Sequence, residues 1–187
     1  MINASRRISA GLPLLVLLAF SSLQAWSQAL QKETLPGALN YHRMDATAAC
    51  GGVISLDALS ELKRRGFAAV VDFQFAKEPK ATVEAERKAA LALGLKYINL
   101  PMMPKEPDAE AIVEAFLKAV KDPANLPIYI HSGEAHRAGA LWAIKRVRVD
   151  GWTVERALAE AQVFADQSVG WRNMREFVLD YVKVHPR

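Results

Sequence analysis

The stretch IYIHSGEAHRAGALW, residues 128–142, contains three consecutive local patterns, those of a strand, a loop and a helix. A short apolar run is typical of a buried strand, a small polar loop follows from Ser132 to His136, and a helix is expected to begin near Arg137. Backbone N–H groups in such a loop form an anion-sized concavity, and the N-terminus of the helix adds partial positive charge. Arg137 is placed to bind two oxygens of a phosphate or sulfate. The stretch therefore predicts an oxyanion-binding loop at the end of a strand.

Strands and helices alternate along the rest of the chain. Short apolar runs predict two more strands, at residues 68–73 and 96–100. Amphipathic patterns and helix-start residues predict helices at 55–65, at 82–93, after Pro107, at 137–148, from Thr153 and at 172–182. Residues 30–50 are expected to form an extended lead-in. This alternation predicts an α/β domain with a central, largely parallel sheet flanked by helices.

The carboxyl ends of parallel strands meet at one edge of a sheet, and ligands usually bind there. The loops after Phe73, Leu100 and Ile130 are therefore expected to converge beside the predicted oxyanion loop. Asp72 lies at the end of its strand, near the same edge. We interpret it as a structural acceptor for loop amides.

The stretch around Ser132 resembles the phosphate loop of the cysteine-dependent protein tyrosine and dual-specificity phosphatases. In that family a strand, a His-Cys pair, a short loop, an arginine and a helix follow one another, and a bacterial branch has four residues between the cysteine and the arginine. Other segments resemble this branch in the same order: Cys50-Gly51-Gly52, Ala69 to Phe73, Asn99 to Met102 and Gly151 to Leu158. The resemblance spans roughly residues 40–165. It implies a three-layer phosphatase-like domain over residues 30–187.

The catalytic cysteine of the family falls on Ser132 of this chain. In the family the loop lowers the pKa of the cysteine, and the thiolate attacks phosphorus to form a thiophosphate intermediate. A serine hydroxyl keeps its proton unless a base removes it. The resemblance therefore implies a loop that binds a phosphorylated or other oxyanion ligand with little or no turnover. A phosphoprotein is one candidate ligand, and no cofactor is implied. The binding residues would be Ser132, Gly133, Glu134, Ala135, His136 and Arg137.

Alternative interpretations stay open at this point. If an unidentified base activates Ser132, the protein is a working phosphomonoester hydrolase. If the loop binds no anion, the protein functions through interactions with other proteins. The chain can also be aligned with family members that have five residues between the nucleophile and the arginine. This second register places His131 at the nucleophile position and Glu134 at a tight turn. We favour Ser132, because a positive φ is costly for glutamate. His131 would then brace the loop, as the corresponding residue usually does in the family.

The general acid of the family is an aspartate on a separate loop. Asp108 is the candidate in this chain, with Glu106 beside it, although we favour a helix-start role for Asp108. His136 is expected on the rim of the loop, either solvated or in contact with ligand. Lys145, Arg146 and Arg148 are expected on the solvated face of a helix.

Composition excludes several classes of protein. The chain has 187 residues, 24 basic and 20 acidic, and the basic excess falls to two once Arg6 and Arg7 are set aside with the first 29 residues. This balance gives no case for nucleic-acid binding. The single cysteine, Cys50, excludes an intrachain disulfide framework, and we interpret it as a partly buried apolar residue. The four histidines show no metal-ligand spacing, so no metal is predicted.

The first 29 residues match a secretory signal peptide. Arg6 and Arg7 precede a short apolar run from Leu12 to Phe20, and Ser27-Gln28-Ala29 places small residues at a cleavage site after Ala29. An apolar run this short does not cross a bilayer as a helix. We therefore expect cleavage, no stable membrane span afterwards, and a periplasmic or secreted protein.

Overall fold

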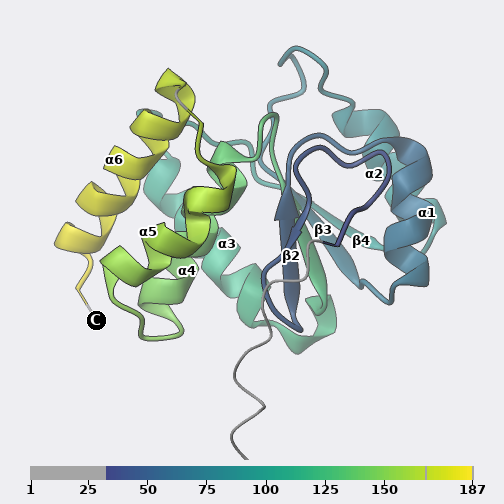
Figure 1. Cartoon of the computed structure of the whole chain (residues 1–187). Coiled ribbons are helices and arrows are strands. Elements are labelled where there is room, and N and C mark those ends of the chain that lie inside the picture. The colour runs from purple at the N-terminus through teal and green to yellow at the C-terminus, as the bar shows by residue number, and fades with distance from the viewer. Residues whose placement is uncertain (1–32, 167, 187) are drawn as a thin grey trace, which may run out of the picture.

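In the computed structural model, residues 33–166 and 168–186 are described, and a five-stranded sheet lies at their centre (Figure 1). The strand order is β1-β2-β5-β3-β4. Only β1 is antiparallel to its neighbour, and the pairs β2–β5, β5–β3 and β3–β4 are parallel. The strands are β1 His42–Arg43, β2 Ala48–Gly51, β3 Ala69–Asp72, β4 Lys96–Asn99 and β5 Ile128–His131. The predicted parallel sheet is confirmed. The predicted signal peptide lies outside the described residues.

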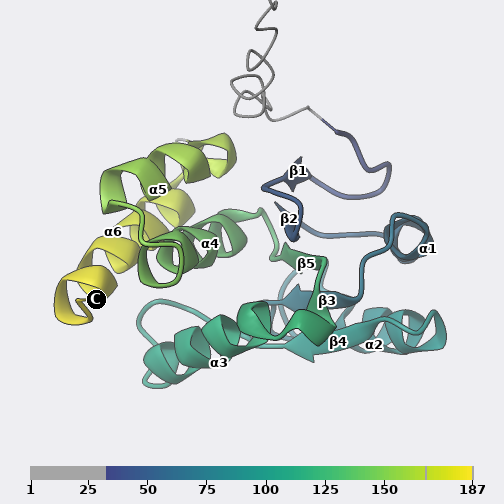
Figure 2. The ribbon, with the colours of Figure 1, turned by 90° about the horizontal axis from the view of Figure 1, so that it is seen from below.

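Helices cover both faces of the sheet, and the alternation of side chains along each strand explains the two layers. In β3, Val71 faces a core shared with α3, α4 and α6, whereas Val70 faces a core shared with α1 and α2. Figure 2 shows these two groups of helices on opposite sides of the strands. The three-layer α/β architecture is therefore confirmed. The helices are α1 Leu56–Arg64, α2 Val83–Ala92, α3 Ala109–Lys121, α4 His136–Arg148, α5 Val154–Ala161 and α6 Val169–Val184, with short 3-10 turns at Pro123–Asn125 and Gln162–Phe164.

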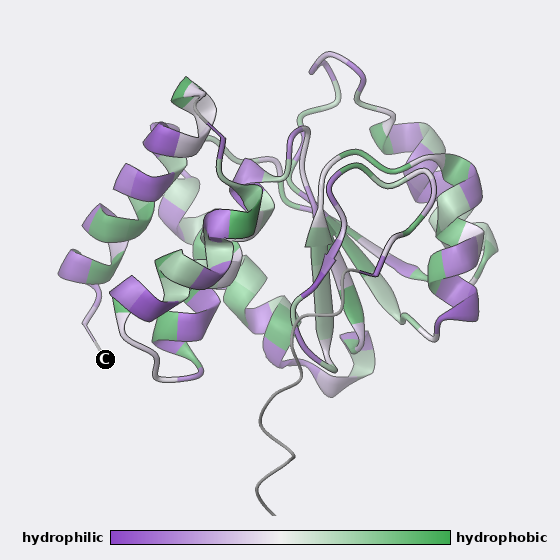
Figure 3. Ribbon diagram, in the orientation of Figure 1, coloured by the Kyte–Doolittle hydropathy of each residue, from purple (hydrophilic) through white to green (hydrophobic). Residues whose placement is uncertain are grey.

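The helix starts follow local side-chain chemistry. Ser55 accepts a hydrogen bond from the Ala58 N–H at 3.3 Å, and Thr153 accepts one from the Arg156 N–H at 3.3 Å. Each bond satisfies a backbone donor that the first helical turn leaves without a partner. Hydrophobic and hydrophilic residues alternate along the outer helices (Figure 3), the pattern of helices with one buried and one solvated face.

The prediction of an extended lead-in through residue 50 was wrong for its last part, because residues 48–51 form strand β2 inside the sheet. Sequence gave little sign of this strand, since Ala48, Ala49, Cys50 and Gly51 carry no apolar alternation. All four residues are buried between β1 and β5. Small side chains are needed there, and a Cβ atom on Gly51 would lie 2.5 Å from the Tyr129 hydroxyl. Burial raises the pKa of the Cys50 thiol well above its usual value, so this cysteine is a poor nucleophile.

The prediction of a solvated basic face on the helix after the loop was also wrong. Helix α4 packs against both α5 and α6, and most of its residues are buried, including Lys145 and Arg146. The guanidinium of Arg146 is held by carboxylates from three segments. Its partners are Glu160 at 2.8 Å, Asp150 at 2.8 Å and Asp45 at 3.0 Å. The buried charge is neutralised by these carboxylates, and two of them, Asp45 and Glu160, lie outside α4, where a helical pattern alone does not reveal them.

We expect Arg146→Ala to lower the free energy of unfolding by about 2–3 kcal/mol, because it leaves three partly buried carboxylates without their shared counter-charge. Urea unfolding followed by circular dichroism measures this. Arg64→Ala is the matched control, since Arg64 pairs with Glu61 on an exposed helix face and its loss should cost no more than about 1 kcal/mol. Equal small losses in the two variants would contradict the buried network.

Candidate anion-binding site

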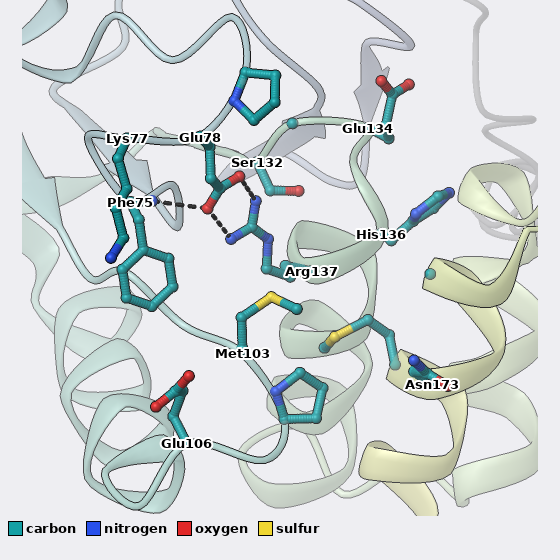
Figure 4. A pocket seen from close by; sticks show the side chains of 15 residues that line it. Phe75, Lys77, Glu78, Met103, Glu106, Ser132, Glu134, His136, Arg137 and Asn173 are labelled. Carbon is teal, nitrogen blue, oxygen red and sulfur yellow. Dashed lines mark hydrogen bonds and ion pairs between the residues drawn. The ribbon is translucent and has the colours of Figure 1, made fainter.

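A pocket of about 900 Å³ opens at the carboxyl ends of β3, β4 and β5 (Figure 4). The loops after these strands converge there, as predicted from the parallel topology. Helix α6 forms a further wall that sequence reasoning did not foresee. The lining residues are Phe75, Lys77, Glu78, Pro79, Met103, Pro104, Glu106, Ser132, Gly133, Glu134, His136, Arg137, Gly170, Asn173 and Met174.

The floor of the pocket is the loop between β5 and α4. Ala135 adopts the left-handed conformation, with φ of 73°, immediately before α4 begins at His136. The loop is anchored to the segment that follows β2, because the Val53 N–H donates a hydrogen bond to the Gly133 carbonyl at 3.0 Å. Among the turn, loop and capping hydrogen bonds of the described residues, none is donated by the amide N–H groups of residues 133–137. Donors of this kind at the start of a buried helix are what the predicted anion-binding loop requires.

Ser132 lies at the base of this loop. The residue is 1 % exposed, and its Oγ has no hydrogen-bond partner among the described residues. Buried polar atoms are normally satisfied, so an orphaned hydroxyl beside a pocket needs an explanation. The same observation shows that no base is hydrogen-bonded to Ser132 in this structure. The hydroxyl therefore stands in the pocket without the partner that serine nucleophiles use.

Arg137 is oriented by acceptors on one side of its guanidinium. Nη1 and Nη2 donate to the two carboxylate oxygens of Glu78, at 2.7 and 2.5 Å. Nη1 also donates to the carbonyls of Phe73 at 2.7 Å and Met102 at 3.2 Å. These bonds use both Nη1 hydrogens and one on Nη2, so the Nε–H and the second Nη2–H remain on the opposite edge. Among the described residues, none accepts a hydrogen bond from Nε. This is the edge that binds two oxygens of a phosphate side-on.

Glu78 is a site residue that sequence reasoning missed. It lies in the loop between β3 and α2, and its Oε1 also accepts a hydrogen bond from the Phe75 N–H at 2.8 Å. Burial acts to raise the pKa of Glu78, but the hydrogen bonds and charge of Arg137 and the Phe75 N–H outweigh it and lower the pKa. The carboxylate therefore stays ionised and holds Arg137. A lone glutamate in a charged loop carries no sequence signal for this role.

His131 is turned away from the pocket. Its Nε2 lies 2.8 Å from Glu86 Oε1 of helix α2 and 3.7 Å from Asp72 Oδ1, and all three side chains are buried. It therefore braces the end of β5 against α2, whereas the expected contact was with the loop itself. Burial acts to lower the pKa of His131, but Glu86 and then Asp72 outweigh it and raise the pKa.

Asp72 has the structural role predicted for it. Its Oδ1 accepts the Gln74 N–H at 2.8 Å and its Oδ2 accepts the Tyr97 hydroxyl at 2.7 Å. One ligand-type atom from each of Asp72, Glu86 and His131 lies within 4.8 Å of the others, which is compatible with a metal ion. The direct His131–Glu86 contact and the occupied oxygens of Asp72 fit an ion pair with protonated His131 better.

The remaining predicted residues separate into two groups. His136 and Glu134 line the pocket, and His136 Nε2 lies 3.1 Å from Asp166 Oδ2. Asp108 is exposed, does not line the pocket, and stands before α3 without a side-chain capping hydrogen bond. Glu106, two residues earlier, does line the pocket. If the loop after β4 supplies an acid, the geometry favours Glu106 over Asp108.

Comparison with known families decides the affiliation of the chain. The model of the family described as "DSP-PTPase phosphatase fused to NAD+ Kinase" matches residues 23–178. The chain belongs to this dual-specificity and protein tyrosine phosphatase family. The match spans most of the chain and includes the oxyanion loop, which agrees with the resemblance seen in sequence. No curated protein matches the sequence.

Solved structures share the phosphatase fold. A cysteine-to-serine variant of TpbA from P. aeruginosa, in complex with phosphotyrosine, has a TM-score of 0.65 at 24% identity, covering 86% of this chain and 97% of that one. A DUF442 protein from Shewanella putrefaciens has a TM-score of 0.65 at 17% identity, with coverages of 79% and 92%. The catalytic core of S. cerevisiae SIW14 with citrate has a TM-score of 0.60 at 16% identity, with coverages of 81% and 96%.

The raised pKa of His131 predicts a pH-dependent stability. A folded-state pKa above the unfolded value means that protonation stabilises the fold; this contribution is complete below about pH 6.5 and is lost as pH rises through the folded pKa. Glu86→Gln removes the main cause of the raised pKa. We expect urea unfolding at pH 6 and pH 9 to show a smaller pH effect in Glu86→Gln than in the wild type. Glu84→Gln, at an exposed position of the same helix, is the control. Parallel pH curves for wild type and Glu86→Gln would refute the ion pair.

Proposed function

We propose that this chain binds a phosphorylated ligand in the loop of residues 132–137, with little or no turnover. The observation that carries the proposal is the side-on edge of Arg137, which stays available beside loop amides while Glu78 occupies the other edge. An arginine placed in this way recognises a tetrahedral oxyanion without any need for a nucleophile.

The geometry supports Ser132 as the residue at the position of the family's cysteine. Ser132 lines the pocket, whereas His131 turns towards Glu86 in the interior. The left-handed residue of the loop is Ala135, so the turn does not require a positive φ at Glu134. Both observations favour the register with four residues between the nucleophile position and Arg137.

The exchange of sulfur for oxygen separates binding from catalysis. An anion-binding loop lowers the pKa of a thiol enough to make a thiolate, but the serine hydroxyl starts from a far higher pKa and remains protonated. Binding depends on the amides and on Arg137, which the exchange leaves in place. The serine variant of TpbA that holds phosphotyrosine supports the idea that such a loop keeps its ligand.

Hydrolysis of an aryl phosphate by the purified mature protein tests this proposal. We expect negligible activity from the wild type, a gain of at least about a hundredfold in Ser132→Cys, and loss of that gain in Ser132→Cys with Arg137→Ala, because a thiolate nucleophile contributes several kcal/mol only in an intact loop. Binding of inorganic phosphate, measured by calorimetry, should be retained in Ser132→Cys and lost in Arg137→Ala. An absence of phosphate binding in the wild type would refute the proposal.

A working hydrolase is the second candidate, and one observation favours it. His136 lines the pocket and is held by Asp166 at 3.1 Å, and an Asp-oriented histidine is the usual base for a serine nucleophile. His136 and Ser132 share no hydrogen bond in this structure, so this arrangement is incomplete. Strong wild-type turnover that disappears in both Arg137→Ala and His136→Gln would establish this candidate instead.

We also propose that the protein is exported, on the strength of residues 1–29. In the described part of the chain, no helix is both long and apolar enough to span a membrane. Expression of the full chain in a Gram-negative host, followed by osmotic-shock fractionation, is expected to release a protein that begins at Leu30. Leu15→Arg, which interrupts the apolar run, should leave the precursor inside the cell. An unprocessed wild-type chain in the cytoplasm would overturn the proposal.

A further inference from the structure

A second groove, of about 350 Å³, continues from the phosphate pocket. It lies between the loop after β4 and helix α6, and it shares Met103, Pro104, Glu106 and Asn173 with the pocket. Figure 4 shows Met103, Glu106 and Asn173 on the side of the pocket opposite Glu134. A ligand held by Arg137 therefore reaches this groove without crossing the rest of the surface.

The wall formed by α6 is a single helical stripe. Asn173, Glu176, Phe177 and Asp180 follow the spacing of three, four and seven residues that places side chains on one face. Seven residues of helix span about 10 Å, which is the length of about three residues of extended peptide. The groove therefore has the length of a short peptide segment.

The groove is negatively charged and has an apolar floor. The groove is lined by three acids, Glu106, Glu176 and Asp180, and by one lysine, Lys105. None of the three acids forms an ion pair with another described residue. Met103 is 47 % exposed and Phe177 is half-buried, so both offer apolar contact. Lysine and arginine side chains match such a surface, because their stems pack on apolar groups while their charged ends reach carboxylates.

The charges inside the pocket also limit the ligand. Beyond the Arg137–Glu78 pair, the lining holds one lysine, Lys77, against Glu106 and Glu134. A ligand with several clustered phosphates would meet more repulsion than attraction there. The buried, unpartnered Oγ of Ser132 still indicates a polar group at the base of the pocket. A single phosphate with a positively charged extension is the charge pattern that fits both cavities.

We propose that the groove between the β4–α3 loop and α6 binds a basic residue that flanks the phosphorylated residue of a peptide. The proposal rests on the proposed phosphate binding. It adds a preference among phosphorylated peptides, for a single phosphate with a lysine or arginine within about three residues of it. Glu176 and Asp180 of α6 are then residues that determine specificity, and Arg137 anchors the phosphate.

Three fluorescent phosphotyrosine peptides test the groove, with flanking residues that are basic, neutral or acidic. Binding to the wild-type mature protein is measured by fluorescence anisotropy at low salt. We expect the basic peptide to bind about three- to tenfold more tightly than the neutral one, the range for one or two exposed ion pairs, and the acidic one to bind most weakly. The difference should shrink in about 0.3 M salt, because added ions screen exposed charges.

Charge reversal then locates the effect. Glu176→Lys with Asp180→Lys should abolish the preference for the basic peptide and leave the neutral peptide bound. Glu155→Lys, at an exposed position of α5 outside both cavities, should keep the preference. Equal binding of the three peptides to the wild type would overturn the groove alone. An absence of binding by every phosphopeptide would overturn phosphate binding as well.

Discussion

The ion pair between Arg137 and Glu78 is the interaction on which the anion-binding site depends. A guanidinium at the first turn of a buried helix is costly unless its donors are satisfied. Glu78 and two main-chain carbonyls satisfy one side of it, and they orient the other side towards the loop amides. The same contact ties the loop after β3 to α4. Recognition of an oxyanion is therefore built into the packing of the sheet edge.

Buried charges also secure the two ends of the β5–α4 unit. Below the loop, His131 joins Glu86 of α2, and near the far end of α4, Arg146 joins Asp45, Asp150 and Glu160. Breaking such pairs is expensive because the surviving charge stays buried. A loop that keeps unsatisfied donors and a left-handed alanine needs a rigid frame of this kind.

The proposed separation of ligand binding from turnover rests on one atom, the oxygen of Ser132 at the position of the family's cysteine sulfur. A phosphatase loop stabilises negative charge, which promotes a thiolate and holds a phosphate by the same amides. In the function proposed above, serine at the base of the loop preserves the second ability and removes the first. In the proposal above, the acidic groove beside α6 adds selectivity, since charge around a pocket discriminates among ligands that share a phosphate.

Sequence by itself determined the α/β class, the parallel strands and the strand–loop–helix unit around Ser132 and Arg137, because these depend on local periodicity and adjacent residues. Strand β2 was missed because its four small residues have no apolar pattern. Only the tertiary structure decided that Glu78 holds Arg137, that Glu86 holds His131 and that α6 completes the pocket. These partners lie far apart in the chain, and the crossovers of the fold bring them together. Charge pairs between distant segments produce no periodic pattern in a sequence. A loop that turns, binds an anion and starts a helix, in contrast, requires particular residue types at consecutive positions.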